Sequence, residues 1–120
     1  MTDAYAPLMP KLLSIAREAG DTMRAFHAPS AQAKGGHYNF VTEADIAVQS
    51  LLEERLTALL PASRFYAEER ENSPLTGEPT WVVDPIDGTV NFMRRRALSA
   101  VSVALLADRE PVLGAVYNPY

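Results

Sequence analysis

The sequence predicts an α+β fold, a two-layer arrangement in which two helices pack on one mixed or antiparallel sheet. Two long segments carry apolar residues at helical spacing, and four shorter segments have the composition of strands. Both helical segments precede the strands, so strands and helices do not alternate along the chain as they do in a parallel α/β fold. The length of 120 residues is enough for one compact domain and too short for two.

The two helices are expected over residues 4–27 and from residues 41–45 to Pro61. In each, apolar residues recur every three or four positions and so share one face. Thr42 suits the N-cap of the second helix, with Asp45 three residues later as in a capping box. Residues 30–37 are expected to form a mobile loop. The apolar faces are Leu8, Leu12, Ile15, Ala19, Met23 and Phe26 in the first helix, and Ala44, Val48, Leu51, Leu52, Leu56 and Leu59 in the second.

Four strands are expected after the helices. Residues 64–67 and 81–83 are short candidates, and residues 97–106 and 112–117 are longer ones. The last two would form a hairpin whose turn is residues 108–111, which contain Asp and Pro.

Composition excludes several classes of protein. The chain has no cysteine, which rules out disulfides and zinc-thiolate sites. With 11 basic and 15 acidic residues the net charge is −4, so a basic face for nucleic acid is not expected, and the run of Arg94, Arg95 and Arg96 is interpreted as solvated surface. No apolar run reaches the roughly 18 residues of a membrane span, and the start lacks the pattern of a secretory signal. We therefore expect a cytoplasmic protein.

The chemistry is concentrated where predicted strands end. The apolar strand 81–83 leads into Asp84, and Pro85 and Gly88 are expected to form a tight turn that carries Asp87. Glu68 ends the preceding strand, so adjacent strands could bring a third carboxylate to this point. Two carboxylates about 4 Å apart repel by roughly 4 kcal/mol at an effective dielectric constant near 20, so a proton or a cation must relieve them. Hard oxygen ligands without Cys or His favour Mg²⁺.

A simpler interpretation stands beside this one. Asp84 and Asp87 could be turn and N-cap residues only, because Asp, Pro and Gly are ordinary turn formers, and Glu68 could be surface charge. The residues that follow Asp87 in the sequence favour the interpretation as a metal site. Gly88 and Thr89 could begin a short helix whose free N–H groups suit a phosphate oxygen, and the Thr89 hydroxyl could orient a water beside Glu68. Metal, phosphate and water together predict phosphomonoester hydrolysis.

Residues 84–92, Asp-Pro-Ile-Asp-Gly-Thr-Val-Asn-Phe, resemble the first signature of the inositol monophosphatase family. Further landmarks of that family occur in order and at similar spacing over most of the chain. They are Lys34 and Asn39, Val41-Thr42-x-x-Asp45, Phe65-x-x-Glu68-Glu69, and Ala100-Val101-Ser102-Val103.

The resemblance implies a two-metal phosphatase site. Glu68, Asp84 and the carbonyl of Ile86 would hold the first Mg²⁺, and Asp84 and Asp87 the second. Mn²⁺ would be a possible substitute, and Li⁺ is expected to inhibit. The substrate would be a small phosphorylated alcohol, and the complete protein would be a homodimer.

The resemblance also implies catalytic and substrate-binding roles. Glu68 and Thr89, aided by Asp45, would activate the attacking water. The amides of Gly88 and Thr89, with Asp87, would hold the phosphate. For Asp45 a role as a helix cap remains an alternative.

The chain departs from the family pattern in places. Ala67 stands where Gly is usual, Asn39 where Asp is common, Val90 where a second Thr is common, and Arg96-Ala97 replaces Phe-Pro. None is a proposed ligand. The second signature of the family is absent from the 120 residues, so the resemblance is to the N-terminal metal- and phosphate-binding half of an αβαβα fold.

Two classes of function are weighed. The first is Mg²⁺-dependent hydrolysis of inositol monophosphate or a similar polyol phosphate, favoured by Asn91, with residues 1–120 alone inactive or weak. Within this class, histidinol phosphate, 3′-phosphoadenosine 5′-phosphate and fructose 1,6-bisphosphate are alternative substrates. The second is a non-catalytic metal-binding or interaction module that keeps the signature of its family.

Overall fold

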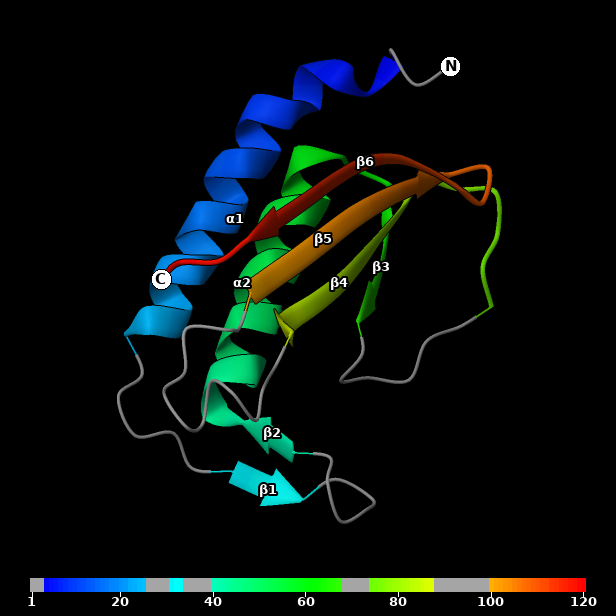
Figure 1. Ribbon diagram of the computed structural model, residues 1–120. Coiled ribbons are helices and arrows are strands. Elements are labelled where there is room, and N and C mark those ends of the chain that lie inside the picture. Colours follow the sequence, from blue (N-terminus) through cyan, green and yellow to red (C-terminus); the bar gives the residue numbers. More distant parts are fainter. Residues whose placement is uncertain (1–3, 26–30, 34–39, 68–73, 88–99) are drawn as a thin grey trace.

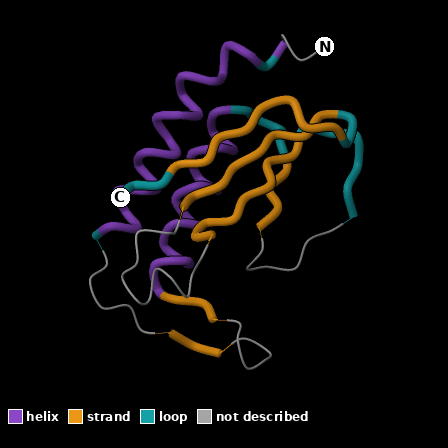
Figure 2. Tube along the Cα trace, viewed as in Figure 1, coloured by secondary structure: helices purple, strands orange, loops and turns teal. Residues whose placement is uncertain are grey.

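The computed structural model describes residues 4–25, 31–33, 40–67, 74–87 and 100–120. Two α-helices lie side by side on one face of a twisted sheet (Figures 1 and 2). Neither is long and apolar enough to cross a membrane. The elements are the 3₁₀ helix η2 (Ala6–Leu8), α1 (Met9–Arg24), β1 (Ala31–Ala33), β2 (Phe40–Thr42), α2 (Glu43–Leu59), β3 (Arg64–Ala67), β4 (Thr80–Asp87), β5 (Ala100–Ala107) and β6 (Glu110–Tyr117).

The main sheet has four strands in the order β3-β4-β5-β6. β3 pairs with β4 in parallel, and the other two pairs are antiparallel, so the sheet is mixed. The predicted fold class is therefore confirmed. The parallel pair matters for the site, because parallel strands end at the same edge of a sheet.

The core lies between the helices and the inner face of the sheet. β5 alternates buried and half-buried residues along its length, as a strand covered on one side does. Trp81 is fully buried, and its strand neighbours are Phe65 and Leu105. The core is completed by Leu12, Ala19, Met23, Ala44, Val48, Leu52, Leu56, Ala67, Val83, Ile86, Val101 and Val103.

Both predicted helices are confirmed, with shorter bounds. α1 begins at Met9 rather than residue 4, because the segment before it forms the 3₁₀ helix η2. α2 ends at Leu59, two residues before Pro61. This end is expected, because a proline disfavours the helical conformation of the residue that precedes it. Thr42 directly precedes α2, in the position predicted for the N-cap. The side chain of Thr42 lies outside the described set, so its capping bond stays a prediction.

The prediction of a loop over residues 30–37 is wrong at residues 31–33. These residues form β1, which pairs antiparallel with β2 in a separate two-stranded sheet. Such a ladder is held by backbone hydrogen bonds, and three residues are too few to show a strand period in the sequence. Residues 34–39 lie outside the described set.

The prediction of a tight turn after Asp84 is also wrong for the residues up to Asp87. β4 continues through Pro85 to Asp87, and its register with β5 shifts between Asp84 and Asp87. A bulge of this kind accommodates a proline, which has no N–H to donate to the ladder. The signature therefore begins inside a strand.

The β5–β6 hairpin is confirmed with a tighter turn than predicted. Its two loop residues, Asp108 and Arg109, have φ of 51° and 66°, the left-handed conformation that suits a two-residue hairpin loop. The Asp108 N–H donates to the Gly77 carbonyl at 3.1 Å and fixes the tip of the hairpin against the segment before β4. Glu110 and Pro111, expected in the turn, belong to β6.

The end of β6 packs closely on α1 at Gly20. A Cβ built on Gly20 would lie 2.5 Å from two ring carbons of Tyr117 and 3.2 Å from the Cβ of Pro119. The C-terminal segment lies across α1 in Figure 1. The absent side chain at Gly20 therefore permits this approach.

We expect Gly20→Ala to lower the free energy of unfolding by about 1 kcal/mol, although Ala favours a helix by about that amount over Gly. In a Tyr117→Ala background the same change should instead raise it by up to about 1 kcal/mol, since the clash is gone. Urea denaturation of the four proteins, followed by circular dichroism, gives the coupling. Equal effects of Gly20→Ala in both backgrounds would contradict the packing.

Candidate metal and phosphate site

The proposed ligands come from two neighbouring strands: Glu68 follows the end of β3, and Asp84 lies within β4. In the parallel β3–β4 pair, Ala67 lies opposite Val83. Along the chain, the next residues are Glu68 and Asp84. The sequence prediction that β3 and β4 are adjacent is confirmed. Glu68 itself lies outside the described residues.

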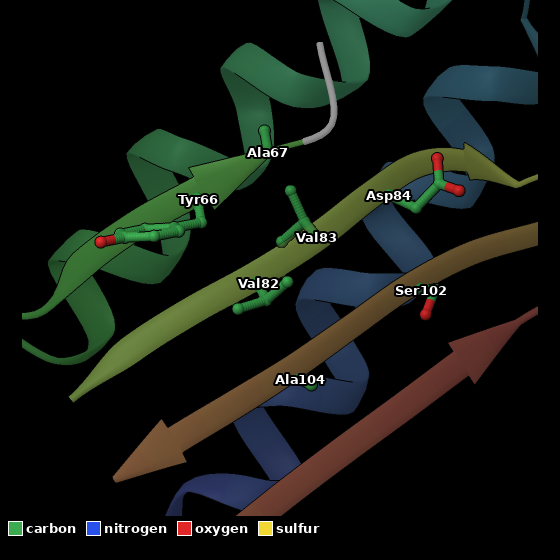
Figure 3. Close-up of a pocket in the computed structure, with 7 residues that line it drawn as sticks. All are labelled: Tyr66, Ala67, Val82, Val83, Asp84, Ser102 and Ala104. Atoms are coloured by element: carbon green, nitrogen blue, oxygen red, sulfur yellow. The ribbon is translucent and has the colours of Figure 1, made fainter. Parts of the chain in front are cut away.

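A pocket of about 410 Å³ contains Asp84. It lies on the face of the sheet away from the helices, where the Asp84 carboxylate projects from β4 and the Ser102 hydroxyl from β5 (Figure 3). The volume is within the range of small-molecule sites. The pocket is lined by Tyr66, Ala67, Val82, Val83, Asp84, Ser102 and Ala104.

The lining is mostly apolar, with one carboxylate. Asp84 is half-buried and makes interactions within the protein. Tyr66 is held in place because its hydroxyl donates to the Pro74 carbonyl at 2.6 Å and its ring lies 5.5 Å from the Arg64 guanidinium. Arg64 in turn donates to the Thr76 hydroxyl at 3.2 Å. The pocket thus presents a negative charge beside a fixed apolar wall.

Asp45 is the third residue of α2 and is fully buried. It makes interactions within the protein, and it is not among the residues that line the pocket. A carboxylate in the first turn of a helix is favoured by the helix dipole, which agrees with the capping alternative. A catalytic role for Asp45 stays a prediction.

Ile86 and Asp87 complete β4. The Ile86 side chain is 2% exposed and belongs to the core. Because a hydrocarbon side chain has no ligand atom, Ile86 could serve only through its backbone carbonyl. Asp87 is the last residue of the strand, and its side chain is outside the described set.

The remaining predicted site residues, Glu68, Gly88 and Thr89, lie outside the described residues. Within the described part of the chain, no three His, Cys, Asp or Glu side chains gather to hold a metal ion. Of the predicted set, the half-buried Asp84 carboxylate and the Ile86 carbonyl are placed on one strand. Both offer oxygen atoms as ligands, and hard divalent cations prefer oxygen ligands.

Of the residues that line the pocket, only Asp84 was predicted from the sequence as a site residue, and the polar residues Tyr66 and Ser102 were not. Ser102 served there only as part of a family landmark, and Tyr66 only as part of a strand. The alternation along each strand puts Tyr66, Val82 and Ser102 on the outer face, but neighbours across strands follow from the register. Only the pairing of Asp84 with Ser102 brings the second hydroxyl into the pocket.

The comparisons with known proteins agree on the family and the fold. The profile of the inositol monophosphatase family matches residues 6–120. The 3′(2′),5′-bisphosphate nucleotidase CysQ of Aggregatibacter actinomycetemcomitans is 38% identical over 117 residues, which are 93% of this chain and 44% of that protein. Inositol monophosphatase 2 of Solanum lycopersicum is 37% identical over 113 residues, covering 89% of this chain and 43% of that protein.

The solved IMPase of Thermotoga maritima superimposes with a TM-score of 0.84 at 26% identity, covering 92% of this chain and 44% of that one. The chain thus spans less than half the length of the relatives that it matches. The match to the family profile covers nearly all of its residues. We conclude that this chain belongs to the inositol monophosphatase family.

Proposed function

We propose that residues 1–120 are the N-terminal, metal- and phosphate-binding part of a Mg²⁺-dependent phosphomonoester hydrolase. The observation that carries the proposal is the Asp84 carboxylate, which opens the signature and lies in a pocket beside β3, β4 and β5. Named relatives of the chain are phosphatases and a nucleotidase. A solved IMPase/NADP phosphatase, 23% identical and so alike in fold alone, is complexed with Mg²⁺ and phosphate.

Four residues would hold the cations. Asp84 would contribute to both, with Glu68 and the Ile86 carbonyl at the first and Asp87 at the second. A bound divalent cation at this place supplies Lewis acidity toward water and phosphate oxygens. Mg²⁺ fits the oxygen donors best, and Mn²⁺ is proposed as a substitute with Li⁺ as an inhibitor.

The chain's own residues would do the rest of the chemistry. Glu68 and the Thr89 hydroxyl would orient the attacking water and accept its proton. Asp45 would support Thr89 from the start of α2. The N–H groups of Gly88 and Thr89 would bind the phosphate oxygens, as backbone amides at a helix N-terminus do. Each role fits phosphomonoester hydrolysis by in-line attack of water.

We propose inositol monophosphate or a similar polyol phosphate as the substrate, on the basis of Asn91 in the signature. The CysQ nucleotidase is the reason to keep an adenosine bisphosphate as the alternative substrate. We further propose that the complete protein is cytoplasmic and a homodimer.

A non-catalytic module is the second candidate function. The chain covers 44% of the length of its CysQ relative. The resemblance to the family implies that a further metal ligand lies in the other half. Losing a carboxylate leaves a loosely held second cation, and losing the far wall of the site removes positioning worth several kcal/mol of the barrier.

We therefore expect residues 1–120 alone to release little phosphate from inositol 1-phosphate with Mg²⁺. A chimera in which the remaining part of the tomato inositol monophosphatase follows Tyr120 should release it at least about a hundredfold faster, since it restores the positioning. A malachite green assay measures both, with adenosine 3′,5′-bisphosphate as the second substrate. A folded chimera that hydrolyses neither substrate would contradict the proposed phosphatase activity. A preference for adenosine 3′,5′-bisphosphate would contradict the proposed polyol phosphate substrate.

A further inference from the structure

Ser102 is the cross-strand partner of Asp84. The two residues are directly opposite each other in the antiparallel β4–β5 register, and both line the pocket (Figure 3). Side chains in such a pair share one face, and their Cβ atoms lie roughly 4.5–5.5 Å apart. Ser102 therefore lies beside Asp84 in the wall of the same pocket.

The other neighbours of Ser102 on this face whose side chains the structure describes offer it no polar group. On the far side its register partner is Val116, which is 73% exposed, and along its own strand the neighbours are Ala100 and Ala104. Among the neighbours with described side chains, Asp84 is thus the polar one.

The hydroxyl of Ser102 is also available. Three lining residues have polar side chains, and the Tyr66 hydroxyl is already bonded to Pro74. The Ser102 hydroxyl makes no hydrogen bond with any residue that the structure describes, although Ser102 is half-buried. A half-buried hydroxyl normally has a partner, from the protein or from water.

We propose that Ser102 is a positioning residue for the cation at Asp84: its hydroxyl accepts a hydrogen bond from a water molecule that the cation retains. This inference rests on the proposed function, because it takes Asp84 to be a cation ligand. Mg²⁺ dehydrates reluctantly and keeps several waters in protein sites. When a group that hydrogen-bonds to the ligands of a metal is removed, the affinity of the protein for that metal typically falls by 10- to 100-fold.

Titration of the melting temperature of the 120-residue chain with Mg²⁺ tests the proposal without any assay of activity. Ser102→Ala should raise the Mg²⁺ concentration needed for half of the stabilisation about tenfold. Ser102→Thr, which keeps the hydroxyl and suits a strand, should bind nearly as the unmodified chain does. Ser50→Ala removes the same hydroxyl from an exposed position on α2 and should leave the titration unchanged.

The metal-free melting temperature separates positioning from a structural role. It should be the same in Ser102→Ala as in the unmodified chain, since the hydroxyl holds no described residue. If the unmodified chain binds Mg²⁺ and Ser102→Ala binds it equally well, the role of Ser102 is wrong and the proposed function stands. If the unmodified chain gains no stability from Mg²⁺, both are wrong.

Discussion

Replacing Asp84 with Asn is expected to abolish the rise in melting temperature that Mg²⁺ gives the unmodified chain. A ligand that binds only the folded state stabilises it by mass action, by about 2.7 kcal/mol at a hundred times its dissociation constant. For a domain of this size that corresponds to about 10 °C. Asn keeps the shape of Asp but loses the charge of the ligand proposed for both cations.

Circular dichroism melts at increasing Mg²⁺ concentration measure this effect. Asp21→Asn makes the same change at an exposed position of α1 and should melt as the unmodified chain does at every concentration. NaCl at matched ionic strength controls for screening of the net negative charge. A shift that persists undiminished in Asp84→Asn would show that the cation binds elsewhere.

Replacing Trp81 with Ala is expected to lower the free energy of unfolding by about 3–5 kcal/mol. Trp81 is fully buried on β4 between Phe65 and Leu105, on the face that the helices cover. Truncating a large aromatic residue in a core costs about 3–5 kcal/mol, which is a large share of the roughly 5–15 kcal/mol that stabilises a typical domain. The measurement is urea denaturation followed by circular dichroism, because the variant loses the single tryptophan of the chain.

Trp81→Phe is the matched control. It keeps an aromatic ring in the core and removes an indole N–H that has no hydrogen-bond partner in the described part of the structure. A buried donor without a partner is itself costly, so we expect a loss of less than about 1.5 kcal/mol. A loss as large as that of Trp81→Ala would show that the indole N–H has a partner that matters.

The helices and most of the strands could be predicted because their signals are local. Apolar residues such as Leu12 and Leu52 recur at the helical period, and both lie in the core as expected. The strand β1 gave no such signal, since three residues are too few for a period. Pro85 indicated a turn, but it lies within β4 at a bulge in the pairing with β5. The sequence alone does not show such a bulge, because it depends on which strand pairs with β4.

The chemistry proposed for the site also came from the sequence. Oxygen ligands without cysteine, and the motif from Asp84 to Phe92, led to the family that the comparisons confirm. The positions of Asp84 and Ile86 on one strand agree with that prediction. Roles for Glu68, Thr89 and Asp45 remain predictions.

What only the tertiary structure decided is which side chains are neighbours across elements. Ser102 lies opposite Asp84 because of the β4–β5 register, and Tyr117 contacts Gly20 because β6 ends on α1. A shift of one residue in the register would turn Ser102 to the other face. Register is set by the bulge at one end of β4 and the hairpin turn at Asp108 and Arg109, together with burial of the whole inner face. These constraints join residues far apart in the chain. The residue types therefore determine the chemistry proposed for the site, and the packing determines which side chains lie next to it.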